Sequence, residues 1–140
     1  MWYNGIIKGL LRSPLHRLMS TSTLLITYTG RKSGKVYTTP VNYVQKGQYV
    51  LVTSMRQRTW WRNLLGGAPV VVRIQGRDYD GFAHALTVPD EVATGLMNYL
   101  RLVPRQARYF GVGLDGDGLP IQKDVKAAAR ERVVVSIRLA

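Results

Sequence analysis

Hydrophobic residues recur with two different periods along the chain, and the change of period separates its expected elements. Residues 2–19 follow a helical period, with Ile and Leu on one face and Lys, Arg and His on another. We therefore expect an amphipathic helix over residues 1–20, which Pro14 would kink or break. A basic helix of this kind either covers the domain with its apolar face or lies on a membrane surface.

The period then changes to the alternation that is typical of β-strands. Residues 23–29, 36–45 and 48–54 are rich in β-branched and aromatic side chains, and short connections separate them. Short connections favour an antiparallel meander of three strands. Pro40 lies inside the second of these strands, which indicates an edge position or a bulge.

The second half of the chain mixes strand and helix patterns. The expected elements are a short helix from Trp60 to Gly66, strands over 69–75 and 78–87, a helix over 87–103 capped by Thr87, further turns over 105–110, and a final strand over 132–139. Sequential strands of this kind tend to curl and close, because closure removes exposed edges. We predict a mainly β (α+β) fold, a six-stranded antiparallel barrel with peripheral helices, in a single domain over residues 1–140.

The charge balance points to anionic partners. Lys and Arg number 20 against 8 Asp and Glu, which gives a net charge of +12, and 14 of the 20 cations are Arg. Such an excess favours nucleic acid, an anionic lipid surface or a phosphorylated ligand, and Arg suits bidentate contacts with phosphate or carboxylate. The plain alternative is a basic surface that keeps the protein soluble.

Several kinds of chemistry lack their sequence signatures. Without cysteine the chain has no thiol nucleophile and no thiolate metal site, and its two histidines, His16 and His84, lack metal-ligand spacing. No Walker loop, no G-x-G-x-x-G motif and no carboxylate pair of useful spacing occurs. We expect no metal, and a cytoplasmic protein, since the N-terminus also lacks a signal-peptide cleavage site.

Two basic loops remain as candidates for binding. The first, GRKSG at residues 30–34, joins the first two strands, and the second, residues 53–63, carries three arginines beside Trp60 and Trp61. In a meander both loops leave the barrel at the same end, and turn amides around Gly30 and Gly34 can bind an anion. Such loops suit a phosphorylated flat-ring cofactor or a nucleic acid. We expect one of the two tryptophans to pack in the core.

The segments TGRKSGKVYTTPVNY, VLVTS, WWRNL and VVVRIQGRDYDGFAHAL, between about Leu24 and Leu86, together resemble the deazaflavin-dependent nitroreductase and quinone reductase family. The resemblance implies a split β-barrel related to FMN-binding oxidoreductases, with residues 23–86 supplying the cofactor-binding strands and 87–110 peripheral helices. It implies factor 420 as the cofactor, with flavin mononucleotide as the alternative. The basic loop would then hold the coenzyme's phosphate and acidic tail.

The resemblance also implies which residues bind the coenzyme. The expected cofactor-binding residues are Gly30, Arg31, Lys32, Ser33, Gly34, Thr38, Thr39, Pro40, Val52, Thr53, Ser54, Arg56, Arg58, Trp60, Trp61 and Asn63. Family members often carry Lys-Gly-Gly after the serine equivalent to Ser54, and here Arg56 and Arg58 would replace that lysine. Tyr99, Tyr109 and Phe110 are candidates for the acceptor pocket, and no catalytic side chain is assigned.

The function implied by the resemblance is hydride transfer from the reduced coenzyme to a small electron acceptor such as a quinone or nitro compound. An FMN-binding protein, or a cofactor- or lipid-binding protein without catalysis, is the alternative. Nucleic acid is not expected as a partner, because no recognition helix or ribonucleoprotein motif occurs. Peripheral membrane association through the first helix and a homodimer both stay open.

Overall fold

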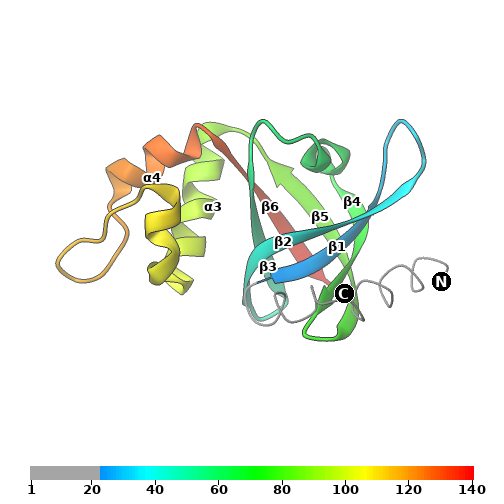
Figure 1. Ribbon diagram of the computed structural model, residues 1–140, viewed down its shortest axis with the longest axis horizontal. Helices are drawn as coiled ribbons and strands as arrows, with labels where there is room; N and C mark the ends of the chain where they lie inside the picture. Colours follow the sequence, from blue (N-terminus) through cyan, green and yellow to red (C-terminus); the bar gives the residue numbers. More distant parts are fainter. Residues whose placement is uncertain (1–22) are drawn as a thin grey trace.

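The computed structural model describes residues 23–140, so the expected helix over residues 1–20 lies outside the described residues. Within that range six antiparallel strands close into a barrel in the order β1-β2-β3-β6-β5-β4 (Figure 1). The strands are β1 (Thr23–Thr29), β2 (Val36–Lys46), β3 (Tyr49–Met55), β4 (Ala68–Ile74), β5 (Arg77–Leu86) and β6 (Arg132–Leu139). The predicted fold class, a six-stranded antiparallel barrel, is therefore confirmed.

Alternation of side chains builds the barrel wall. In β6, Val133, Val135 and Ile137 join the apolar cluster inside the barrel, while Val134 joins a second cluster under the helices. Successive strand residues face opposite sides of a sheet, so one strand serves both clusters. This two-sided burial explains the continuous apolar run of β6.

Three of the four helical elements within residues 23–140 lie on one side of the barrel, and the fourth lies at one end of it (Figure 1). They are η1 (Trp60–Leu64), α3 (Pro89–Leu102), η2 (Pro104–Phe110) and α4 (Gln122–Ala129), and of these η1 lies at the barrel end while the others form the side layer. The α3 helix packs closely on β6, because a Cβ added at Gly95 would lie 3.0 Å from the nearest side-chain atom of Val134. The helical layer therefore has a fixed position against the barrel.

Two details of the helices differ from the sequence expectation. The α4 helix was not predicted, because its segment has few large apolar residues and buries only Val125 and Ala129. Thr87 does not cap α3: the N-cap is Val88, without a side-chain cap, and the Thr87 carbonyl accepts a hydrogen bond from Arg56. Pro89 in the first turn, which needs no N–H donor there, marks the start instead.

Candidate functional site

The barrel wall opens between β2 and β3. Residues 36–42 of β2 pair with β1, whereas β2 pairs with β3 only from Tyr43 to Lys46. The end of β3, from Thr53 to Met55, pairs with β6 on its other side. Among residues 23–140, the two strand edges that face the opening have no strand partner. Backbone polar groups along these edges are therefore available to a ligand.

Pro40 lies in the part of β2 that borders the opening, opposite Leu25 of β1. A residue without a backbone N–H is tolerated best where one edge of its strand is unpaired. The edge position expected for Pro40 thus exists in a closed barrel, because β2 and β3 pair over only part of their length. We call the opening between the unpaired parts of β2 and β3 the seam.

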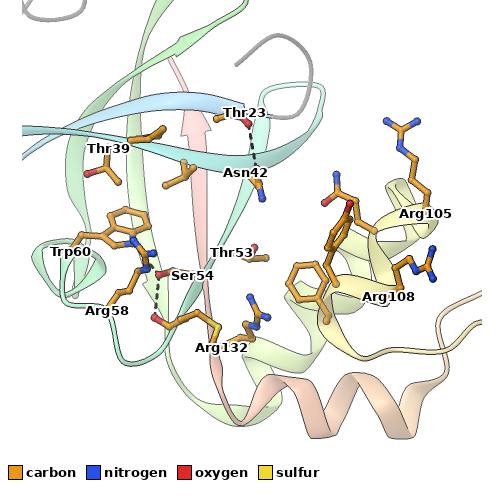
Figure 2. A pocket seen from close by; sticks show the side chains of 16 residues that line it. Thr23, Thr39, Asn42, Thr53, Ser54, Arg58, Trp60, Arg105, Arg108 and Arg132 are labelled. Carbon is orange, nitrogen blue, oxygen red and sulfur yellow. Dashed lines mark hydrogen bonds between the residues drawn. The ribbon is translucent and has the colours of Figure 1, made fainter. Parts of the chain in front are cut away.

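A cavity of about 910 Å³ lies at the opening (Figure 2). This volume falls near the upper end of the range of roughly 300–1,000 Å³ that is usual for small-molecule sites. The middle of β2 and the end of β3 form one wall, η1 and the loop before it form a second, and η2 forms a third. The expected cofactor-binding residues that line the cavity are Thr39, Pro40, Thr53, Ser54, Arg58 and Trp60.

The indole ring of Trp60 is held in place at the cavity wall. Its Nε1 donates a hydrogen bond of 3.0 Å to Ser54 Oγ, which in turn donates to the Met55 carbonyl at 3.1 Å. The ring also lies against Tyr28, with centroids 5.8 Å apart. Because Ser54 is buried, these contacts fix one orientation of the ring and leave its remaining surface to the cavity.

The basic loop between β1 and β2 is ordered by its own backbone. The Gly30 N–H donates to the Lys35 carbonyl, and the Gly34 N–H donates to the Gly30 carbonyl. Ser33 Oγ accepts the Lys35 N–H at 3.2 Å. The amides of both glycines are thus engaged, and in the described part of the chain the loop amides without a hydrogen-bond acceptor are those of Lys32 and Ser33.

Asn63 joins this loop to η1. Its Oδ1 accepts the Arg31 N–H at 3.0 Å, and its Nδ2 donates to the Trp60 carbonyl at 2.9 Å. The Arg31 guanidinium also approaches Gly66, where a Cβ would lie 3.7 Å from Nη2. One asparagine therefore holds the loop and the Trp60 segment at the same end of the barrel (Figure 1).

Other expected site residues lie away from the cavity. Val52 and Trp61 belong to the barrel core, and the buried Trp61 Nε1 has no acceptor among the described residues. Arg56 donates to the backbone carbonyls of Thr87 and Arg132, which places it in a structural contact. The Thr38 hydroxyl lies 3.0 Å from that of Thr27 on the neighbouring strand. Neither these residues nor the basic loop itself, residues 30–34, line the cavity.

The third wall contains residues that the sequence analysis mostly missed. Arg105, Gln106 and Arg108 of η2 and Arg132 at the start of β6 line the cavity, together with the acceptor-pocket candidates Tyr109 and Phe110. Only the clustering of Arg with aromatic residues in RQARYF could have indicated this wall. Arg132 gives no signal in sequence, since its place depends on how β6 joins the barrel.

Tyr99, the other acceptor-pocket candidate, lies beneath this wall and is fully buried. Its hydroxyl donates to Gln106 Oε1 at 3.0 Å, and its ring meets Phe110 edge-on at 5.9 Å. Burial raises the pKa of the Tyr99 phenol to about 12, and the nearby Thr53 hydroxyl opposes this to a smaller extent. Tyr99 therefore supports the wall as a neutral phenol and does not line the cavity.

Comparison with known families and structures adds to this picture. A family model described as F420H(2)-dependent quinone reductase matches residues 12–115. No curated protein matches the sequence. Solved structures share the fold at low sequence identity, so each of those likenesses concerns the fold alone.

Three of these structures show the range of similar folds. A conserved hypothetical protein from Mycobacterium tuberculosis has a TM-score of 0.59 and 16% identity, covering 91% of this chain and 80% of that one. A structure described as an F420-H2 dependent reductase has a TM-score of 0.51 and 19% identity, covering 82% and 93%. A protein of unknown function from Agrobacterium tumefaciens has a TM-score of 0.57 and 17% identity, and the match covers 87% of this chain but only 50% of that protein.

Two further structures widen the set of ligands and assemblies found with this fold. A protein from Mesorhizobium loti, described as FAD-binding, has a TM-score of 0.52 and 17% identity, covering 91% of this chain and 90% of that one. Another, described only as a domain-swapped dimer, has a TM-score of 0.56 and 17% identity, covering 98% and 97%.

Proposed function

The chain belongs to the F420H(2)-dependent quinone reductase family, and we propose that it transfers a hydride from reduced factor 420 to an electron-poor acceptor such as a quinone or a nitro compound. The observation that carries the proposal is the seam, where β2 and β3 run without pairing to each other. Unpaired strand edges and the fixed Trp60 indole border one large cavity there. Such a combination suits a flat ring with polar groups on its rim.

The residues at the seam fit a deazaflavin ring. The edge of β3 at Thr53 offers a backbone donor and acceptor, and Trp60 offers an aromatic face. Tyr28 backs the indole, and its hydroxyl lies 3.2 Å from that of Thr39, a second cavity residue. A wall built this way is rigid before the ligand arrives, which lowers the cost of binding.

The basic loop supplies the features that a phosphate needs. The amides of Lys32 and Ser33 have no acceptor among the described residues, and the side chains of Arg31 and Lys32 add positive charge. Asn63 holds this loop at the Trp60 end of the cavity. We infer that Arg31, Lys32 and Ser33 hold the coenzyme's phosphate, with Arg58 at the cavity wall beside them.

The chemistry divides between cofactor and protein. When bound, reduced factor 420 supplies a hydride, which together with a proton reduces a quinone to a hydroquinone. The protein's part is to hold the acceptor against the cavity wall and to exclude water from it. The residues that line the cavity include Thr39, Thr53 and Tyr109, which carry hydroxyl groups. We propose that the proton reaches the acceptor from solvent, either directly or through a hydroxyl of the wall.

Flavin mononucleotide is the second candidate cofactor. Both cofactors need a flat pocket and a phosphate site, and the similar fold of the Mesorhizobium protein is described as FAD-binding. The family match favours factor 420. Measuring binding and turnover with each of the two cofactors distinguishes between them.

The test of this function is turnover with a defined acceptor. Purified protein, reduced factor 420 and 1,4-naphthoquinone are mixed without oxygen, and the return of the oxidised coenzyme's absorbance is followed. We expect saturable, protein-dependent oxidation of the coenzyme. A rate equal to that of the protein-free mixture, or turnover with reduced FMN alone, would overturn the proposal.

Assembly and membrane contact stay predictions. The structure described as a domain-swapped dimer is a reason to examine whether this chain forms a homodimer, by light scattering of the purified protein. The expected membrane contact involves residues 1–20, which lie outside the described residues. No helix within residues 23–140 is long and apolar enough to span a bilayer.

A further inference from the structure

We propose that the physiological acceptor is an aromatic molecule with a carboxylate or a similar anionic oxygen group, held by Arg105, Arg108 and Arg132. The inference rests on the proposed function and narrows it to one chemical class of acceptor. That class is selected by the third wall of the cavity, which we call the η2 wall and which consists of the lining residues of 105–110 together with Arg132. Five observations support it: four concern side chains at the cavity, and the fifth concerns their distance from the basic loop.

The cavity is lined by positive charge alone. Arg58, Arg105, Arg108 and Arg132 border it, and no Asp or Glu does. All 8 acidic residues of the chain lie within residues 23–140, and none of them lines the cavity. A cavity with charge of one sign concentrates ligands of the opposite sign.

The arginines of the cavity have no carboxylate partner. Within residues 23–140 the single ion pair joins Arg73 to Asp78, on β4 and β5. Residues 1–22 contain no Asp or Glu, so that segment has no acidic side chain to offer. The guanidinium groups of the η2 wall are thus left for a ligand, and guanidinium binds carboxylate and related oxyanions in a bidentate way.

Arg132 is already partly removed from water. Its guanidinium lies over the Phe110 ring, 4.6 Å from the centroid. Burial lowers the pKa of Arg132 from its usual value, while the negative charge of Glu131 partly opposes this effect. An anion beside a partly desolvated guanidinium would offset the cost of that desolvation. Arg132 therefore marks the inner end of the anion site.

The η2 wall also offers aromatic surface. Phe110 is held between Arg132 above and Tyr99 at its edge. Tyr109 is 79% exposed although it lines the cavity, so most of its ring is free to cover a ligand. Aromatic side chains beside arginines suit a ligand that has both a ring and an anionic group.

The η2 arginines are separate from the expected phosphate site. Figure 2 shows Trp60 and Arg58 on one side of the cavity and Arg105 and Arg108 on the other, with Thr53 between them. The basic loop is tied to the Trp60 side through Asn63. A coenzyme anchored by that loop would leave the opposite arginines to the acceptor.

The experiment measures binding of two quinones to the coenzyme-free protein. The probes are 1,4-naphthoquinone and its 2-sulfonate, and the readout is quenching of tryptophan fluorescence at low salt. We expect the sulfonate to bind at least about tenfold more tightly, which is the effect of one or two charge-assisted contacts. Since neither reduced coenzyme nor turnover is needed, this result is independent of whether the proposed reaction occurs.

Two double variants provide the comparison. Arg105→Gln with Arg108→Gln should abolish most of the preference for the sulfonate, and Arg105→Lys with Arg108→Lys should keep part of it. The matched control is Arg101→Gln with Arg130→Gln, which removes the same charge from two exposed positions outside the cavity. The control should keep the full preference.

The same variants are titrated with oxidised factor 420. Unchanged coenzyme affinity in the Arg105→Gln, Arg108→Gln protein, with loss of the sulfonate preference, supports the proposal. Equal binding of both quinones to the wild type would overturn it. So would a large loss of coenzyme affinity in this variant with the preference intact, because the arginines would then serve the coenzyme's acidic tail.

Discussion

Side chains at the seam work in pairs, in which one residue fixes the position of another. Ser54 orients the Trp60 indole, and Asn63 holds the backbone of Arg31. Sequence adjacency gives no indication of such roles: Trp60 and Trp61 are neighbours, yet Trp60 lines the cavity and Trp61 is buried in the core. The sequence predicts that one of the two adjacent tryptophans packs in the core, but only the path of η1 decides which tryptophan does so.

Arg31 and Lys32 provide the first prediction at this scale. Replacing both by Ala should weaken coenzyme binding by about 2–4 kcal/mol if both make charge-assisted contacts to phosphate. The matched control replaces Lys46 and Arg77 by Ala, exposed residues beside the β2–β3 and β4–β5 turns at the other end of the barrel. Fluorescence titration with factor 420 measures both. Equal affinity in the two proteins would place the phosphate elsewhere.

Tyr99 gives a prediction about alkaline stability. Its pKa in the folded protein is about 12 because of burial, against roughly 10 in an unfolded chain. Above pH 10 the unfolded state therefore releases the proton first, so folding loses about 1.4 kcal/mol per pH unit until the folded pKa is reached. Below pH 10 the contribution of Tyr99 is fully present.

Urea unfolding of the wild type and of Tyr99→Phe at pH 9 and pH 11 measures this effect. Between the two pH values the wild type should lose roughly 1 kcal/mol more of its unfolding free energy than the variant does. Tyr79→Phe, at a part-exposed position on β5, serves as the control and should behave like the wild type. Parallel losses in wild type and Tyr99→Phe would show that Tyr99 ionises normally in the folded state.

At the scale of elements, local sequence patterns were enough to predict most of the fold. Runs rich in β-branched and aromatic residues, separated by short connections, predicted each strand from β1 to β6 to within one residue of its observed ends. The α4 helix escaped prediction because its segment QKDVKAAA has no apolar stripe, only Val125 and Ala129 buried four residues apart. Small residues suffice there because α4 packs against α3 as well as the barrel.

The connection between the basic loop and η1 leads to a prediction about two elements together. Asn63→Ala removes an acceptor for the Arg31 N–H and a donor to the Trp60 carbonyl. We expect a loss of about 1–3 kcal/mol in coenzyme binding and in unfolding free energy combined, the cost of two unmade hydrogen bonds. Asn98→Ala, at an exposed position on α3, is the control and should change neither by more than about 0.5 kcal/mol.

Titration and urea unfolding of both asparagine variants separate the two contributions. Weaker coenzyme binding with little change in stability would mean that Asn63 mainly positions the loop. Wild-type coenzyme affinity in Asn63→Ala would contradict a loop that must be tied to η1 in order to bind.

At the scale of the whole molecule, the sequence located only part of the cavity lining. The seam exists because β2 pairs with β3 over only four residues, from Tyr43 to Lys46, and then the two strands part. Pro40 is the one signal of an unpaired edge in β2, and the point where the strands part follows from how β1 and β6 hold the diverging ends. The η2 wall joins the cavity for the same reason, through packing of distant segments. The family resemblance supplied the β2 and β3 residues but not Arg105, Arg108 or Arg132.

The net charge of +12 is a property of the whole molecule, and it is compatible with either a nucleic acid or an anionic coenzyme as the partner. Nucleic acid would bind through many phosphates, and its affinity would fall steeply with salt as counterions are released. A coenzyme held in a cavity neutralises fewer charges than a stretch of nucleic acid does, so its affinity should fall less steeply with salt. The two kinds of partner therefore differ in how strongly binding depends on ionic strength.

The most direct measurement is a tryptophan-quenching titration with factor 420 and, separately, with FMN, at low and high salt. It is made on the wild type and on Trp61→Phe, which leaves Trp60 as the tryptophan at the cavity wall. The account predicts saturable binding of factor 420 at micromolar concentration or tighter, quenching that Trp61→Phe retains, and modest dependence on salt. Binding of neither cofactor, or of FMN alone, would contradict it.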